Sequence, residues 1–387
     1  MPVINRVADL SDEIAEWRRD MHIHPELLFE VHRTAALVAD RLRAFGCDEV
    51  VTGIGRTGVV GVIRGRRGSG GRAIGLRADM DALPIEEATD VPYKSQTPGL
   101  MHACGHDGHT AMLLGAAKYL AETRNFDGSA VVIFQPAEEG GGGGAEMVKD
   151  GIMTRFGVEE VYGMHNWPGM PVGQFAIRTG PIMAAADRFT ITVEGKGGHA
   201  AHPHQCIDTL LVASQIVVAL QGVVARNVDP LESAVLSVCS FKSGETFNVI
   251  PQTATLLGTV RTLKAEVQDL LEARISEVAK GVASAHGASA SVVYNRGYPV
   301  TVNHPDQTDF MAKIAGEVGT QVNTDIAPQM GSEDFSYMLQ ERPGAYIFVG
   351  NGDSALCHHP AYDFDDSAIP YGVSLWARIV EQRLPAA

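Results

Sequence analysis

The chain has 387 residues, of which 45% are hydrophobic and 20% are charged, and these values are typical of a packed globular protein of about two domains. Its formal net charge of -15 argues against nucleic acid as a partner, because a phosphate backbone requires clustered Lys and Arg side chains. Five cysteines without regular spacing fit a reducing compartment and argue against a disulfide framework.

The sequence shows neither a secretory signal nor an evident membrane span. Residues 1–20 carry acidic and basic side chains throughout and have no apolar core. The longest apolar stretch, residues 210–220, is interrupted by Ser214 and Gln215 and is shorter than a bilayer requires. We therefore expect a cytoplasmic protein without a membrane partner.

Strand and helix patterns alternate in the first part of the chain. Helical patterns cover residues 12–46, with a break near Pro25, and 107–123, whereas buried strand patterns cover 58–63, 73–78, 130–134 and 160–164. This alternation predicts an α/β domain with a largely parallel sheet. Polar motifs follow three of these strands, and ligand sites in open α/β sheets gather at the carboxyl ends of the strands.

The pattern changes near Asp187. Strand patterns then cover residues 188–194, 234–240, 253–262 and 288–294, and helical patterns cover 208–225 and 265–286. Their order, β-α-β-β-α-β, is the ferredoxin-like order. From Pro305 the earlier style returns, with helices over 305–318 and 369–383 and a strand over 345–349. We therefore predict a catalytic domain built from residues 1–186 and 300–387, and an inserted ferredoxin-like domain over residues 187–299.

Cys104 and His106 stand two residues apart directly before a predicted helix. A thiolate and a neutral imidazole are good ligands for zinc and similar divalent ions. The alternative is a structural cysteine with a surface histidine, but His102 and His109 would make that an unusual loop. His109 would then orient a ligand, or simply stand near the start of the helix.

Glu138 and Glu139 follow a predicted buried strand. Adjacent side chains of an extended segment point in opposite directions, so we expect one carboxylate to face a metal and the other to face the substrate as a general base. The alternative is a solvated turn. Gln135-Pro136 and the glycine run 140–144 favour a constrained backbone and a functional role.

Further histidines are candidates for the same site. His165 ends a predicted strand, where a lone histidine is more often a satisfied core residue, but the other ligands favour a metal role. His358 and His359 compete for a last ligand position, because adjacent residues rarely both reach one site.

Other polar residues are suited to orient ligands or to bind substrate. Asp79 and Asp81 follow a strand and could orient ligating histidines, with an exposed acidic turn as the alternative. In the predicted inserted domain, His199 lies in a glycine-lined turn. We expect Asn248 and Arg261 to lie near His199, and both suit a substrate carboxylate, although Arg261 could instead form a structural salt bridge.

With these motifs together, the chain resembles the M20 metallopeptidase and aminoacylase family. The resemblance is to its branch of hippurate hydrolases and N-acyl-amino-acid amidohydrolases, including hydrolases of indoleacetyl-amino acids, and it runs nearly end to end. It rests on segments 18–26, 76–84, 101–109, 135–139, 165–168, 195–199, 244–251, 330–335 and 358–364.

The resemblance implies two divalent metal ions per subunit, with Cys104 bridging them. It favours His358 over His359, because the family's ligand precedes the proline by two positions. The implied ligands are Cys104, His106, Glu139, His165 and His358. Zinc suits the thiolate best, and manganese, cobalt or nickel remain open.

The resemblance also implies roles for the remaining candidates. Glu138 matches the general base, and Asp79 replaces a metal-binding histidine of the broader family, so it would at most orient a ligand. The inserted domain would act as a lid and a dimerisation domain, with His199 reaching the active site of a partner subunit. Asn248 and Arg261 match positions that bind the substrate carboxylate.

The resulting hypothesis is hydrolysis of an N-acyl amino acid to a carboxylic acid and a free amino acid, in a homodimer or homotetramer. Metal ions would activate the attacking water, Glu138 would move its proton, and His199 would stabilise the oxyanion. Three alternatives stay open. They are a dinuclear dipeptidase or aminopeptidase, a non-catalytic metal-dependent binding protein, and an enzyme that uses Cys104 as a nucleophile.

Overall fold

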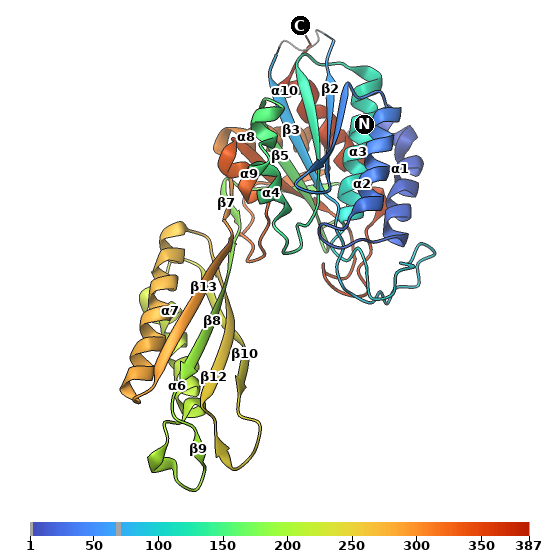
Figure 1. Cartoon of the computed structure of the whole chain (residues 1–387). Coiled ribbons are helices and arrows are strands. Elements are labelled where there is room, and N and C mark those ends of the chain that lie inside the picture. Colours follow the sequence, from blue (N-terminus) through green and yellow to red (C-terminus); the bar gives the residue numbers. More distant parts are fainter. Residues whose placement is uncertain (1–2, 67–70, 387) are drawn as a thin grey trace. The chain divides into compact units, whose positions relative to one another are not determined.

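The computed structural model describes residues 3–66 and 71–386, which divide into two compact units. Unit 1 consists of Met1–Ile182, Val302–Ala327 and Asp334–Ala387, and unit 2 consists of Met183–Thr301 and Pro328–Glu333. The chain therefore leaves unit 1 after Ile182 to form most of unit 2 and returns at Val302 (Figure 1). It enters unit 2 again for Pro328–Glu333 before it ends in unit 1.

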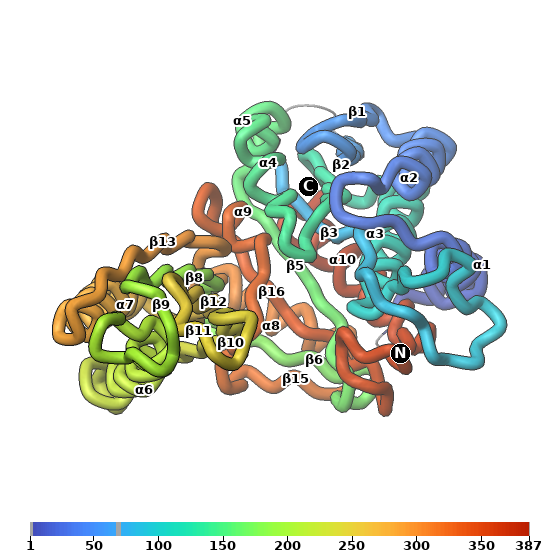
Figure 2. Tube along the Cα trace, turned by 60° about the horizontal axis from the view of Figure 1, so that its bottom comes forward, coloured from blue at the N-terminus to red at the C-terminus, as the bar shows by residue number. Residues whose placement is uncertain are grey.

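Unit 1 is built on a mixed sheet that has eight strands in the described part of the chain, in the order β1-β2-β4-β3-β5-β16-β6-β15. At its centre, β3 pairs in parallel with β4 and β5, and β16 pairs in parallel with β5, so that segments far apart in sequence run side by side (Figure 2). The strands are β1 (Glu49–Ile54), β2 (Gly58–Arg64), β3 (Ala73–Asp79), β4 (Ser129–Gln135), β5 (Val158–Trp167), β6 (Gln174–Ala176), β15 (Gln321–Asn323) and β16 (Gly344–Gly350).

The predicted parallel sheet is confirmed for this centre but not for its two sides. On one side β6 pairs antiparallel with β16. On the other side β1 pairs antiparallel with β2, and β2 pairs antiparallel with β4. Only residues 55–57 separate β1 from β2, and such a short connection can join only antiparallel neighbours, because a parallel pair needs a long crossover. The carboxyl ends of β3, β4, β5 and β16 still meet at one edge of the sheet.

Helices cover both faces of this sheet, with α1, α2 and α3 on one side and α4 and α9 on the other (Figure 1). Almost every residue of α3 from His106 to Leu120 is buried, because α1 and α10 pack against it. A Cβ atom at Gly115 would lie 2.5 Å from Ile14 Cδ1 and 2.9 Å from Val373 Cγ2, so both side chains would have to shift to admit one. The helices are α1 (Asn5–Ile23), α2 (His32–Ala44), α3 (His106–Thr123), α4 (Gly143–Lys149), α5 (Ile152–Arg155), α8 (Pro305–Val318), α9 (Ser336–Glu341) and α10 (Ile369–Arg383).

Unit 2 has the predicted ferredoxin-like order. Its antiparallel sheet runs β10-β12-β8-β13, and α6 and α7 pack on it around a core that includes Phe189, Ile216 and Leu271. The elements are β8 (Ala185–Glu194), α6 (Thr209–Asn227), β10 (Ala234–Ser243), β12 (Thr253–Thr262), α7 (Ala265–Ala285) and β13 (Ser289–Tyr298), with the short strands β9 (Gly198–His199) and β11 (Val249–Ile250).

Helix α6 is longer than the apolar stretch suggested. By length and composition alone it is sufficient to cross a membrane, so the expectation that this stretch is too short is wrong. One face of the helix, with Val212, Ile216, Leu220 and Val223, is buried against unit 2. The helix therefore packs one face on the sheet of unit 2 and leaves Leu211 and Val218 on the other face exposed.

Candidate metal centre

The implied ligands come from segments of unit 1 that meet at the carboxyl ends of the central strands. Cys104 precedes α3, His106 is the first residue of that helix, and Glu139 lies in the turn after β4. His165 lies within β5 rather than after it, and His358 lies in the loop that follows β16. The topology of the sheet therefore brings together residues that are far apart in the sequence.

Glycine is required between the first two of these residues. Gly105 has φ +86°, in the left-handed region that favours glycine. A Cβ atom there would lie 2.3 Å from Asn166 Nδ2 and 2.4 Å from the Tyr362 hydroxyl. Only glycine lets the chain turn from Cys104 into α3 while both neighbours stay in contact with it.

The candidate ligand atoms approach closely enough to share metal ions. Cys104 Sγ lies 3.3 Å from His165 Nε2, and Glu139 Oε1 lies 3.2 Å from His358 Nε2 and 3.9 Å from His106 Nε2. Five groups among the described residues each have possible ligand atoms within 4.8 Å of one another. Three of them contain only the implied ligands and Glu138: Cys104 with His106 and His165, Cys104 with Glu139 and His358, and His106 with Glu138 and Glu139. The groups overlap, as expected for ligands of two neighbouring ions.

Hydrogen bonds leave the Nε2 atoms of two candidate ligands, His106 and His165, as acceptors. His106 Nδ1 donates to the carbonyl oxygen of Asp81 at 2.8 Å, and His165 Nδ1 donates to the carbonyl oxygen of Asn166 at 2.6 Å. In this tautomer each Nε2 carries a lone pair, which at His165 faces Cys104 Sγ. His106 Nε2 is one of the buried atoms without a hydrogen-bond partner among the described residues. It therefore fits a divalent cation.

The charge of the site also favours a cation. Burial alone would lower the pKa of His106, but the negative charges of Asp79, Asp81 and Glu139 outweigh burial and raise it to about 10. The imidazole therefore lies in a field that stabilises positive charge at its position. A divalent metal ion supplies that charge without protonating the ligand.

Glu138 and Glu139 do not lie in an extended segment, so the expectation that their side chains point in opposite directions is wrong. Both residues are in a turn, which follows Ala137 with φ +56°. The carboxylate of Asp81 accepts the backbone N–H groups of Glu138 at 2.9 Å and Glu139 at 3.1 Å, which folds the backbone. A carboxylate oxygen from each of these two residues and a ring nitrogen of His106 consequently lie within 4.8 Å of one another.

Asp79 lies at the end of β3 and holds a histidine that is not among the implied ligands. Its carboxylate accepts from His109 Nδ1 at 2.6 Å and from Arg77 Nη1 at 2.8 Å, and lies 3.6 Å from His106 Nε2. His109 Nε2 in turn accepts the backbone N–H of Asn166 at 2.9 Å. Asp79 is therefore linked through His109 to the strand that carries His165.

Asn166 connects three parts of the site, and sequence reasoning missed it. Its Nδ2 donates to the carbonyl oxygen of Cys104 at 2.6 Å, and its Oδ1 accepts from the Tyr362 hydroxyl at 2.8 Å. Its backbone N–H is held by His109. The only signal in the sequence was the position of Asn166 directly after a candidate ligand.

A second network that sequence reasoning missed supports the start of α3. His22 Nδ1 lies 2.9 Å from Asp107 Oδ2 and His22 Nε2 lies 3.4 Å from Glu87 Oε1, all in buried surroundings. Burial would lower the pKa of His22, but hydrogen bonds to Asp107 and Glu87 raise it to about 9. Arg18 is buried beside Asp107 and donates to Asp366 at 2.8 Å. These ion pairs fix the helix turn that carries His106.

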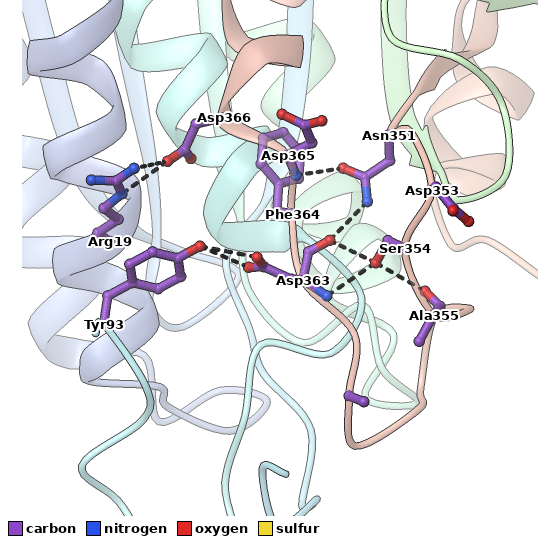
Figure 3. Close-up of a pocket in the computed structure, with 11 residues that line it drawn as sticks. Arg19, Tyr93, Asn351, Asp353, Ser354, Ala355, Asp363, Phe364, Asp365 and Asp366 are labelled. Atoms are coloured by element: carbon purple, nitrogen blue, oxygen red, sulfur yellow. Dashed lines mark hydrogen bonds and ion pairs between the residues drawn. The ribbon is translucent and has the colours of Figure 1, made fainter. Parts of the chain in front are cut away.

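The loop that carries His358 is closed by hydrogen bonds between its two limbs (Figure 3). Asn351 Nδ2 and Ser354 Oγ both donate to the carbonyl oxygen of Asp363, at 2.9 and 2.8 Å. The Tyr93 hydroxyl donates to the Asp363 carboxylate at 3.0 Å, beside a cavity of about 440 Å³. The segment between the limbs is therefore held as a closed loop.

In unit 2, His199 and Asn248 lie together and are exposed. His199 pairs with Val249, and the Ala200 N–H donates to the Asn248 carbonyl oxygen at 3.0 Å. Arg261 pairs with Ala186, at the other end of β12 from these residues. About eight residues of extended strand, roughly 26 Å, separate the two ends. The expectation that Arg261 is near His199 is therefore wrong within one subunit.

Comparison with known proteins identifies relatives along the whole chain. A model of "Peptidase family M20/M25/M40" matches residues 75–382. Hippurate hydrolase of Campylobacter jejuni is 42% identical and covers 98% of each chain, and N-acetyl-L-cysteine deacetylase of Bacillus subtilis is 43% identical over 94% of this chain and 86% of that protein. A solved Bacillus subtilis structure, a dinuclear metal binding peptidase from the M20 family, has a TM-score of 0.83 at 33% identity and covers 97% of this chain and 99% of that chain.

The fold and the site define a metal-dependent hydrolase with a catalytic domain and an inserted lid domain. The chain belongs to peptidase family M20. Its relatives and its groups of metal-ligating side chains make it an amidohydrolase of this family that uses divalent metal ions.

Proposed function

We propose that this protein cleaves the amide bond of N-acyl amino acids to give a carboxylic acid and a free amino acid. The observation that supports this most directly is the turn that places two carboxylates, Glu138 and Glu139, beside His106. One can hold a metal while the other handles a proton. Two relatives are named for hippurate and N-acetyl-L-cysteine, and both of those compounds are N-acyl amino acids.

The proposed ligands of two divalent ions are Cys104, His106, Glu139, His165 and His358. Zinc fits best because thiolate and imidazole are its preferred ligands, and manganese, cobalt and nickel share part of this preference. When bound, such ions polarise the scissile carbonyl and acidify a water molecule. The catalytic domain would consist of residues 1–186 and 300–387.

Glu138 is the proposed general base. Its backbone is fixed by Asp81, and the residue is only 7% exposed, so a proton on its carboxylate is shielded from bulk water. It takes a proton from the attacking water and then donates that proton to the nitrogen of the departing amino acid. The same carboxylate therefore serves both halves of the reaction.

Residues of the lid, 187–299, complete the proposed site. We propose that His199 comes from a partner subunit and donates to the developing oxyanion, and that Asn248 and Arg261 bind the substrate carboxylate. The separation of Arg261 from the other two supports a contribution from two subunits. Leu211 and Val218 on α6 are 50% and 73% exposed, which supports a homodimer or homotetramer. All five cysteines are free, which fits the cytoplasm.

The proposal is tested with purified protein whose metal has been removed by a chelator and replaced by zinc, manganese or cobalt. Release of free amino acid is measured from N-acetyl and N-benzoyl amino acids and from unblocked dipeptides. Metal-restored cleavage of the blocked substrates supports the proposal. Cleavage of unblocked dipeptides alone would make the enzyme a dipeptidase, and metal binding without any cleavage would favour a binding protein.

A further inference from the structure

Cys357 lies beside Cys104 although 253 positions separate them in the sequence. The backbone N–H of His358 donates to the carbonyl oxygen of Ala103 at 2.7 Å, which holds the two segments side by side. Cys357 Sγ is 4.0 Å from the carbonyl oxygen of Cys104, and the two thiols interact with each other. Neither cysteine forms a disulfide in this structure.

The surroundings limit how far the two sulfur atoms can separate. Cys357 lies in the loop closed by Asn351, Ser354 and Asp363, whose limbs are joined by hydrogen bonds (Figure 3). Cys104 is fixed by the hydrogen bond from Asn166 to its carbonyl oxygen. A thiol pair held in this way has a high effective concentration for reaction within the molecule.

We propose that Cys104 and Cys357 form a reversible disulfide when a peroxide reacts with the protein. The more accessible Cys357 attacks the peroxide first, so its S–H bond and the O–O bond break, and a sulfenic acid and one water form. The thiol of Cys104 then attacks that sulfur, an S–S bond forms, and a second water leaves. The two sulfur atoms together lose two electrons, which reduce one hydrogen peroxide to two waters.

The consequence for the metal centre rests on the proposed role of Cys104 as a ligand. A sulfur atom in a disulfide is no longer a thiolate, so the oxidised protein loses Cys104 as a metal ligand. Cys104 belongs both to the group with His106 and His165 and to the group with Glu139 and His358. Metal and peroxide therefore compete for Cys104. Zinc at 100 times its dissociation constant should slow disulfide formation about 100-fold, because only the metal-free fraction reacts.

The experiment treats full-length protein with hydrogen peroxide, with and without zinc. Thiols are counted with a chromogenic reagent, linked peptides are mapped by mass spectrometry without reduction, and zinc uptake is measured before and after dithiothreitol. The expected result is loss of two thiols, a peptide linking Cys104 to Cys357, loss of zinc uptake, and its recovery on reduction. Zinc added first should prevent all of these changes.

Two variants separate this pair from the other thiols. The oxidation is kept mild enough that dithiothreitol restores zinc uptake in the wild-type protein. Under these conditions Cys357→Ala should keep its zinc uptake. Cys239→Ala, at an exposed strand position, should lose it and recover it as the wild type does. A linked peptide with other cysteines, or sulfinic acid at Cys104 without a link, would overturn the proposal. The map of the wild-type protein decides this even if Cys357→Ala fails to fold. Neither readout uses amide hydrolysis, so failure of the proposed function would be seen separately.

Discussion

Replacing Asn166 by alanine tests whether a single side chain holds the metal centre together. The substitution removes hydrogen bonds of 2.6 Å to the Cys104 carbonyl oxygen and 2.8 Å from the Tyr362 hydroxyl. Each buried polar group left without its partner costs about 1–3 kcal/mol, so the free energy of unfolding should fall by about 2–6 kcal/mol. Zinc affinity should fall about 10- to 100-fold, as is typical when a residue that orients a ligand is lost.

The assay combines urea unfolding of the metal-free protein with zinc competition against a chromogenic chelator. Tyr362→Phe removes one of the same hydrogen bonds, so the double variant should be less destabilised than the sum of the two, by about 1 kcal/mol. Asn295→Ala, at an exposed position, is the matched control and should change stability by less than about 0.5 kcal/mol. If Asn166→Ala behaves like this control in both assays, the reasoning about the network is wrong.

Three more substitutions have defined outcomes. Glu138→Gln should lower turnover by at least about 100-fold while metal content, measured by atomic emission, stays at two ions per chain, and retained turnover would mean another base. Gly105→Ala should lower the midpoint of urea unfolding, since the left-handed backbone alone costs about 1–2 kcal/mol and its Cβ would displace Asn166; an unchanged midpoint would contradict the contact geometry. Burial would raise the pKa of Glu160, but hydrogen bonds, first from Arg383, lower it to about 2. This ion pair therefore stabilises the folded protein above the unfolded pKa of about 4.3, and the stabilisation, at most about 3 kcal/mol, is lost as pH falls toward 2. In Glu160→Gln the free energy of unfolding should not show this decrease between about pH 4.3 and about pH 2.

The main architecture could be predicted from sequence because its signals are local. The alternation in β8 and the apolar periodicity of α7 arise from burial of one face, and the predicted element order was confirmed. Strand β1 was missed because only Ile54 in it is buried, so it has no apolar pattern. The antiparallel edge that it forms was missed for the same reason.

The candidate ligands could be identified because their types are distinctive, but their geometry could not. The turn at Glu138 and Glu139 depends on Asp81, which lies far away in the sequence. The separation of Arg261 from His199 depends on strand register, which no local pattern of these residues reveals. Contacts between distant segments decide both features.

The networks around the site could not be predicted at all. Asn166 bonds to Cys104, His109 and Tyr362. His22 is held between two carboxylates, one from a loop and one from a helix. A polar residue with several long-range partners looks in the sequence like any other polar residue. Its role becomes visible only when the fold supplies those partners.

The most direct test of the central claim is metal-dependent release of amino acid from blocked substrates. The chelated protein should be inactive on N-acetyl and N-benzoyl amino acids. Adding about two equivalents of zinc should restore cleavage, because hydrolytic sites of this kind use two ions that share a bridging water. Full activity after exhaustive chelation, or cleavage restricted to dipeptides with a free amine, would contradict a two-metal amidohydrolase of N-acyl amino acids.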